Sequence, residues 1–347
     1  MRFLSFFALS LASFTALAQA DFQKKLQRQL IMAEDGATIT LEAGTYTLNG
    51  SLSLEGKKNI IVRGAGMEKT ILSFKGQTDG AEGLRVSNAE NIMLENFSVQ
   101  DAKGDAIKTM NVNGITFRNV KTEWTGEPKA TNGAYGLYPV MCQNVLIEGC
   151  VAIGASDAGI YVGQSKNIIV RNSRAYHNVA GIEIENSLVA DVYDNESTEN
   201  TGGILVFDLP DLVQKKGGNV RVYNNHIHHN NFPNFAPKGN IVAGVPQGTG
   251  VMILATNQVE IFNNKIIGNN SLGTGIISYF LTENRIKDKD YYPYPTGIYI
   301  HDNVYERDRV RYQGKGRMGQ LFRYKLRFGK KVPHIIYDRI VHANTLE

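Results

Sequence analysis

Two glutamates and three nearby polar residues form the group in this chain whose types and spacing best suit chemistry. Glu183 and Glu185 are two residues apart, so on a β-strand their side chains point the same way, about 6.6 Å apart. In a repeating β-structure the same outward column would hold Tyr161 beside Glu183 and Lys108 further along, with Asp157 just before the strand of Tyr161. We predict these five residues as the catalytic group.

The chemistry open to such a group is acid/base work on a sugar. Two carboxylates beside a tyrosine and a lysine can abstract a proton next to a uronate carboxylate, or hydrolyse a glycosidic bond with two acids. They can equally hold a divalent cation such as Ca²⁺ that neutralises an acidic substrate. The structural alternative is a solvated strand face that carries two glutamates, with no role in a site.

Aromatic side chains are expected to line the groove in which these carboxylates act. Tyr138, Phe207 and Tyr299 fall on the outward columns of the same sheet, and Trp124 and Phe235 lie on long insertions beside it. We predict that these five residues bind substrate.

A second group has metal-ligand chemistry. His177, Glu199 and His229 occupy one repeat position in successive coils, each immediately before an asparagine, so their side chains would stack. Imidazole and carboxylate are competent metal ligands, whereas histidines on exposed turns can also be plain solvated residues.

These placements depend on a short internal repeat. Gly159 and Gly181, Ile160 and Ile182, and Asn178 and Asn200 are each 22 residues apart, within AGIYVGQSKNIIVRNSRAYHN (158–178) and AGIEIENSLVADVYDNESTEN (180–200). A fixed period with alternating apolar residues and Gly/Asn breaks indicates a solenoid of short strands. The sequence predicts an all-β, single-stranded, right-handed parallel β-helix with three strands per coil and about ten coils.

Two registers allow the coils to be counted. A Gly-Ile strand recurs from Ala106-Ile107 to Gly297-Ile298, and a tight-turn position recurs as Asn, Asp or Gly, residues that tolerate a left-handed backbone. Insertions at 121–135, 208–217 and 231–249 lengthen corners beside the Gly-Ile sheet. We expect a binding groove on the outer face of that sheet, since long loops beside a rigid sheet carry binding.

The chain divides into four parts. Residues 1–20 read as an export signal, with Arg2, an apolar run and Ala18-Gln19-Ala20 as a cleavage site, which implies a periplasmic or secreted protein. Residues 21–36 form an amphipathic capping helix, 37–304 the β-helix, and 305–347 a basic C-terminal cap or tail. No later segment is apolar enough to span a membrane.

The charge of the chain is small overall and uneven along it. The formal net charge is +4, which does not suit a nucleic-acid binder. Residues 307–331 nevertheless carry ten Lys/Arg against one acid, either a solvated tail or an attachment point for an anionic partner. Cys142 and Cys150 fall in turns at opposite ends of one strand, beyond disulfide reach, so we expect two unpaired thiols.

The capping helix, the phrase GATITLEAGTY (36–46), the Gly-Ile strands and the turn asparagines resemble the pectin-lyase-like right-handed β-helix superfamily. The resemblance implies enzymes that cleave or epimerise acidic polysaccharides with residues on the outer face of the corresponding sheet. The chain lacks the Asn-Thr-Asp and Gly-His-Gly of polygalacturonases, the Asp-Pro-His of alginate epimerases and the Arg-x-x-Pro-x-x-Arg of pectate lyases.

More narrowly, the chain is similar to exported bacterial proteins described as parallel β-helix repeat-containing. Their genes often accompany a c-type dihaem cytochrome, which implies a cytochrome partner; this chain has no Cys-x-x-Cys-His of its own. A similar periplasmic β-helix assists copper-enzyme maturation without catalysis. Two functions follow: a lyase, epimerase or hydrolase of an acidic polysaccharide, or a non-catalytic scaffold that binds a polymer, a metal or an electron-transfer partner.

Overall fold

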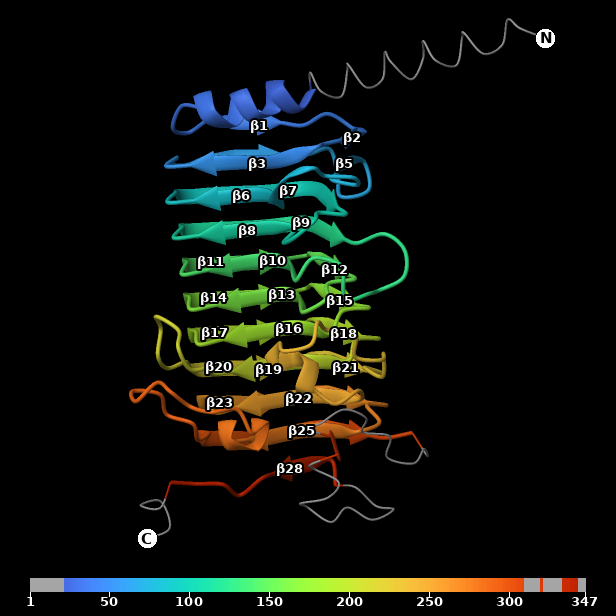
Figure 1. Ribbon diagram of the computed structural model, residues 1–347, viewed down its shortest axis with the longest axis vertical. Coiled ribbons are helices and arrows are strands. Elements are labelled where there is room, and N and C mark those ends of the chain that lie inside the picture. Colours follow the sequence, from blue (N-terminus) through green and yellow to red (C-terminus); the bar gives the residue numbers. More distant parts are fainter. Residues whose placement is uncertain (1–21, 309–318, 321–332, 343–347) are drawn as a thin grey trace, which may run out of the picture.

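The computed structural model describes residues 22–308, 319–320 and 333–342, and these form a right-handed parallel β-helix (Figure 1). One side of the helix is a ten-stranded parallel sheet, and the others belong to an eighteen-stranded sheet that bends around the core. The fold class and the number of coils predicted from the sequence are confirmed.

The ten-stranded sheet receives one strand from each coil. Its members in chain order are β3 (Gly50–Glu55), β6 (Asp79–Ser87), β8 (Ile107–Met110), β10 (Tyr135–Val140), β13 (Ala158–Gly163), β16 (Ala180–Glu185), β19 (Gly202–Phe207), β22 (Thr249–Leu254), β25 (Leu272–Ile277) and β28 (Ile335–Tyr337).

The eighteen-stranded sheet contains two ladders that join at β7 and β9. The first holds β1 (Thr38–Thr40), β4 (Ile61–Arg63), β7 (Glu90–Gln100), β9 (Asn113–Glu123), β11 (Gln143–Glu148), β14 (Lys166–Arg171), β17 (Leu188–Tyr193), β20 (Gly218–Tyr223), β23 (Asn257–Phe262) and β26 (Thr296–His301). The second adds β2 (Gly44–Thr47), β5 (Thr70–Ser73), β12 (Val151–Ile153), β15 (Arg174–Tyr176), β18 (Glu196–Thr198), β21 (His226–His228), β24 (Lys265–Ile267) and β27 (Val304–Glu306).

The inward residues of successive coils stack into one continuous core. Ile160, Ile182 and Ile204 lie in register on neighbouring strands and are completely buried. Alternation along each strand sends every second side chain to this core, so the 22-residue period fixes which residues face outward.

Asparagines hold the corners of the coils. The predicted turn residues Asn172, Asp194 and Asn224 have left-handed backbones, with φ of 49°, 54° and 55°. At another corner, the buried Asn178, Asn200 and Asn230 form a ladder in which each side-chain amide donates to the side-chain oxygen of the next coil, at 3.0 and 2.9 Å. Stacked amides thus satisfy the polar groups that the turns bury.

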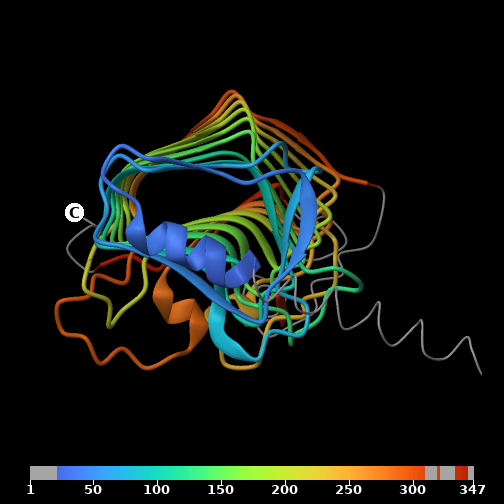
Figure 2. The same ribbon diagram turned by 90° about the horizontal axis from the view of Figure 1, so that it is seen from above.

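A helix over residues 22–32 covers the N-terminal end of the stack, as predicted (Figure 2). Leu26 and Leu30 are buried against the first coil, and Phe22 stacks on Tyr46 with ring centroids 3.7 Å apart. The Gln27 side chain donates to the Ser53 carbonyl and accepts from its amide, both at 2.9 Å. The helix therefore satisfies part of the open edge of β3.

Two strand positions predicted near the C-terminal end are wrong. Gly297-Ile298 lies on β26, which pairs with β23 in the eighteen-stranded sheet and not with the Gly-Ile strands. On β25, Thr274 pairs with Val251, a shift of two residues from the predicted register. The repeat pattern does not reveal the insertion at 278–295, because a Gly-Ile dipeptide can mark a strand without fixing its register, which cross-strand pairing sets.

The last strand of the ten-stranded sheet is β28, which pairs with β25. Segment 305–347 thus supplies a strand to the β-helix. Residues 1–20 and most of the basic run 307–331 lie outside the described residues. Cys142 and Cys150 are free, as predicted, and the structure shows that both are buried. No helix within residues 22–308, 319–320 and 333–342 has the length and apolar character needed to cross a membrane.

Candidate functional site

Three connecting segments cover the outer face of the ten-stranded sheet. Residues 208–217 and 278–295 follow strands of this sheet, and residues 229–248 precede β22; the last two contain the short 3-10 helices η2 (Tyr279–Thr282) and η1 (Ile241–Gly244). Figure 2 shows the orange segment 278–295 outside the stack of coils. Outward residues and these segments share a second apolar cluster, which includes Leu205, Phe207, Val242, Val245, Met252, Leu254, Tyr279 and Tyr291. The predicted open groove is therefore a covered face.

The predicted acidic residues lie under this cover. Asp157, Glu183 and Glu185 have exposed fractions of 5%, 1% and 8%, and Tyr161 has 4%. Tyr161 pairs in register with Glu183 on the next strand, as the repeat predicted. The alternative of a solvated strand face is wrong, because all four side chains are buried.

Two tyrosines hold two of the carboxylates. The Tyr161 hydroxyl donates to Glu185 Oε1 at 2.6 Å. The Tyr135 hydroxyl donates to Asp157 Oδ2 at 3.4 Å, and the Asn240 amide from the covering segment donates to the same oxygen at 3.3 Å. Glu183 differs from them, since its Oε2 is buried without a hydrogen-bond partner.

Burial raises the pKa values of all three carboxyls well above their ordinary range. For Asp157 the charge of Glu185 adds to the effect, and for Glu183 the charges of Asp157 and Glu185 do so. For Glu185, burial outweighs the hydrogen bond from Tyr161. Like charges in a dry site cannot all ionise, so protons are retained among the three near neutral pH. A retained proton makes a carboxyl a hydrogen-bond donor and a general acid.

The acidic cluster reaches the surface through aromatic rings. Tyr135 packs on Tyr138 and on Tyr161 with centroids 4.4 Å apart in both pairs. Lys108 Nζ lies 4.8 Å from the Tyr138 ring centroid and 3.8 Å from Asp105 Oδ2. Tyr138, Lys108 and Asp105 are partly exposed, and burial raises the pKa of Asp105 to about 6. Lys108 and Tyr138, both predicted site residues, therefore mark the accessible end of the cluster.

Three polar residues of this region were not predicted. Tyr135 is the first residue of its strand, and the equivalent residue in the following coils is alanine or glycine. A large polar residue at this position is a signal that an alignment of the repeats contains. Asn240 and Asp208 come from insertions, whose positions follow no repeat. Asp208 is buried, accepts from the Gly217 amide at 2.8 Å, and has a pKa raised by burial to about 7.

The five predicted substrate-binding residues have different surroundings. Trp124 is buried and its indole N–H donates to the Ala102 carbonyl at 2.7 Å, and Phe207 belongs to the second apolar cluster. Phe235 packs on Phe232 within the covering segment. Tyr299 lies on the eighteen-stranded sheet with 60% of its surface exposed, which corrects its predicted place in the groove. Tyr138 borders the acidic cluster, and Phe207 pairs in register with Glu185 on the next strand.

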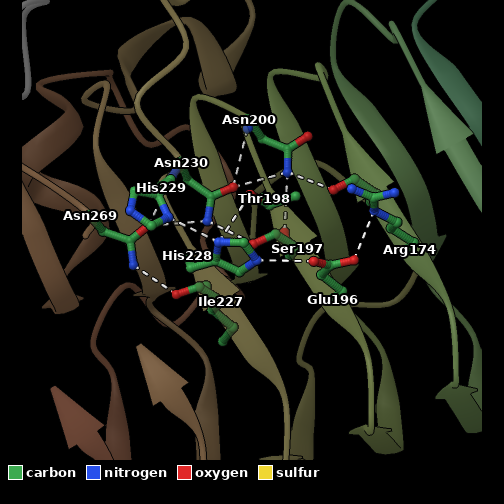
Figure 3. Close-up of polar contacts among 11 residues, drawn as sticks. Arg174, Glu196, Ser197, Thr198, Asn200, Ile227, His228, His229, Asn230 and Asn269 are labelled. Atoms are coloured by element: carbon green, nitrogen blue, oxygen red, sulfur yellow. Dashed lines mark hydrogen bonds and ion pairs between the residues drawn. The ribbon is translucent and has the colours of Figure 1, made fainter. Parts of the chain in front are cut away.

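The structure does not bring the predicted metal ligands together as one group. His177 Nε2 lies 3.3 Å from Glu199 Oε2, whereas His229 faces a neighbouring histidine, with its Nδ1 3.0 Å from His228 Nδ1 (Figure 3). Within the described part of the chain, the three metal-ligating side chains whose ligand atoms converge are Glu196, His226 and His228.

Comparisons place this architecture among known proteins. Residues 53–211 match a family described as "Right handed beta helix region". The chain is thus a right-handed parallel β-helix protein. The matched residues agree with the right-handed parallel β-helix fold described above. No curated protein matches its sequence.

Three solved structures share the fold at low sequence identity. The A-modules of the mannuronan C-5 epimerases AlgE4 and AlgE6 of Azotobacter vinelandii are 16% and 15% identical to this chain, with TM-scores of 0.52 and 0.51. The alignments cover 86% and 93% of this chain and 94% and 96% of the modules. The DFA-IIIase of Arthrobacter chlorophenolicus A6 is 12% identical with a TM-score of 0.51, covering 92% of this chain and 87% of that one. The narrower group of exported proteins and the cytochrome partner find no support among these matches.

Proposed function

We propose that this protein is a carbohydrate-active enzyme that abstracts a proton next to the carboxylate of an acidic polysaccharide, as a lyase or an epimerase does. The observation that carries the proposal is the cluster of Asp157, Glu183, Glu185 and Tyr161, which is buried on one outer face beside Tyr135 and has raised carboxyl pKa values. Perturbed carboxyls that share protons are the arrangement acid/base catalysis requires. Two of the similar structures are mannuronan C-5 epimerases, which supports a uronate substrate.

The residues divide into complementary roles. Protonated Glu183 would donate a hydrogen bond to the uronate carboxylate, which makes the neighbouring C–H more acidic. The ionised form of the Tyr161–Glu185 pair would take the proton from that carbon. A lyase would then break the adjacent glycosidic C–O bond, with a proton passing to the leaving oxygen; an epimerase would return a proton to the opposite face of the same carbon. Lys108 and Tyr138 would bind the polymer at the accessible end.

Access to the cluster requires a movement of the cover. The acids lie below residues 229–248, and Asn240 contacts Asp157 directly. A polymer can therefore reach Glu183 and Glu185 only when this segment moves away from the sheet, as active-site loops do in other enzymes. Given the export signal read from residues 1–20, we propose that the substrate is met in the periplasm or outside the cell.

The test follows proton abstraction at C5 through two products, because an epimerase returns a solvent proton to C5, whereas a lyase leaves a C4=C5 double bond in an unsaturated uronate. The protein is incubated in D₂O with alginate, polygalacturonate and a neutral glucan, and deuterium at the uronate C5 is read by NMR, alongside unsaturated uronates and new reducing ends. We expect deuterium at C5 or unsaturated uronates from one uronate polymer, and we expect both to be lost in Glu183→Gln. Glu260→Gln, which changes a half-exposed glutamate on the other sheet, is the matched control and should keep activity. Reducing ends with neither C5 deuterium nor unsaturated uronates would mean hydrolysis, and silence on every polymer would favour the non-catalytic scaffold.

A further inference from the structure

A cluster of histidines on the eighteen-stranded sheet is independent of the acidic cluster. Strands β18 and β21 pair in parallel, with Glu196 opposite His226 and Thr198 opposite His228. Residues two apart on a strand face the same side, so His226 and His228 project together beside Glu196. Figure 3 shows the His228 ring directed at the Glu196 carboxylate.

The ligand atoms of these three side chains converge. They all lie within 4.8 Å of one another, and His228 Nε2 is 3.0 Å from Glu196 Oε1. The rings of His226 and His228 are stacked, with centroids 3.9 Å apart. Three donor atoms at this separation can close around one ion with small side-chain rotations, since metal–nitrogen and metal–oxygen bonds are about 2.0–2.2 Å long.

Neighbouring residues hold the two best-placed ligands in ligating orientations. His228 Nδ1 lies 3.0 Å from His229 Nδ1 and 3.3 Å from Thr198 Oγ1, so an Nδ1–H has two acceptors and Nε2 keeps its lone pair toward Glu196. His228 Nε2 and Glu196 Oε1 are both electron-rich and lie 3.0 Å apart, so a proton or a metal ion must lie between them. Arg174 binds the other carboxylate oxygen of Glu196 at 2.8 Å and leaves Oε1 for that centre (Figure 3).

We propose that Glu196, His226 and His228 bind a divalent transition-metal ion of the zinc type. Two imidazoles and one carboxylate suit zinc and its neighbours, whereas Ca²⁺ and Mg²⁺ take oxygen ligands. His229 and Thr198 act as positioning residues through His228. Three protein ligands leave a fourth position open to water or to an anion.

The test is a calorimetric titration of the chelator-treated full-length protein with ZnCl₂, and separately with CaCl₂. We expect one Zn²⁺ per chain and no heat from Ca²⁺. Substitution of Co²⁺ gives a second readout, since its visible absorption reports imidazole ligation. His226→Ala and His228→Ala should each weaken Zn²⁺ binding at least tenfold, and His229→Ala should weaken it less.

Two controls keep the assignment falsifiable. His301→Ala removes a histidine that pairs with Glu260 at 3.1 Å on the same sheet, and His177→Ala removes the histidine that pairs with Glu199. Both variants should bind Zn²⁺ as the wild type does, and circular dichroism should show all variants folded. Absence of Zn²⁺ binding, or binding unchanged in both His226→Ala and His228→Ala, would overturn the proposal without bearing on the acidic cluster.

Discussion

The hydroxyl of Tyr161 donates a 2.6 Å hydrogen bond to Oε1 of Glu185, a residue of the next coil, with both side chains buried. The outward column therefore carries paired acids and tyrosines beneath a cover of loops. A strand face that the repeat pattern would leave to solvent has become a dry site, in which proton transfer is governed by burial.

Tyr161→Phe tests the role of that hydroxyl. The ring keeps its packing on Tyr135, whereas Glu185 loses its hydrogen-bond donor. We expect proton exchange on the uronate polymer to fall at least 100-fold, with thermal unfolding within a few degrees of wild type. Tyr193→Phe, on the other sheet, is the matched control. Full activity in Tyr161→Phe would remove Tyr161 from the mechanism.

The stability of the protein should fall as pH rises. Burial raises the folded-state pKa values of Glu183 and Asp157, and raises that of Asp208 to about 7, above their unfolded values near 4. A carboxyl whose pKa is higher in the folded protein than in the unfolded chain stabilises the fold fully at pH values below its unfolded-state pKa. This contribution is lost as the pH rises toward the folded-state pKa. Each carboxyl that stays protonated only when folded lowers the unfolding free energy by about 1.4 kcal/mol per pH unit.

Glu183→Gln should flatten that dependence. The amide has nearly the same shape and cannot ionise, so the variant should be more stable than wild type at pH 7 by about 1–3 kcal/mol and similar at pH 4. Urea unfolding at several pH values measures both. An unchanged slope would show that Glu183 titrates normally in the folded protein.

Asn200→Ala should be strongly destabilising. Its side chain donates to Asn230 Oδ1 and to the Ala175 carbonyl, both at 2.9 Å, and accepts from the Asn178 amide. Because the loss leaves buried polar groups of neighbouring coils unpaired, we expect a cost of about 3 kcal/mol. Asn240→Ala, which changes an exposed side chain of the covering segment, should cost less than about 1 kcal/mol. Equal losses of unfolding free energy in the two variants would show that the buried ladder stabilises the protein no more than an exposed side chain does.

Val189→Asn should stabilise the protein. Val189 has φ of 59° and is 47% exposed, a left-handed backbone that suits asparagine and not a β-branched residue. Asn167 occupies the equivalent position one coil earlier, and its amide donates to Asn144 at 3.1 Å. We expect the free energy of unfolding, measured by thermal unfolding, to rise by about 1 kcal/mol in Val189→Asn. It should fall by a similar amount in the reciprocal variant Asn167→Val. A lower melting temperature in Val189→Asn would contradict this account.

The sequence alone determined the architecture, because each coil of a β-helix packs only on the coils before and after it. The 22-residue period places Tyr161 beside Glu183 and sends Ile160 and Ile182 to the core, whatever the rest of the chain does. The amphipathic pattern of Leu26 and Leu30 likewise fixed the capping helix.

Only the tertiary structure decided whether those residues are exposed to solvent and how far their pKa values are shifted. The insertions that bring Asn240 and Tyr291 over the sheet follow no repeat, so their packing, and with it the burial and raised pKa of Glu183, could not be read from periodicity. Strand pairing placed Tyr299 on another sheet, and the parallel pairing of β18 with β21 brought His228 within 3.0 Å of Glu196. Periodicity specifies which coils are neighbours, whereas solvent exclusion and side-chain direction depend on contacts between segments far apart in the chain.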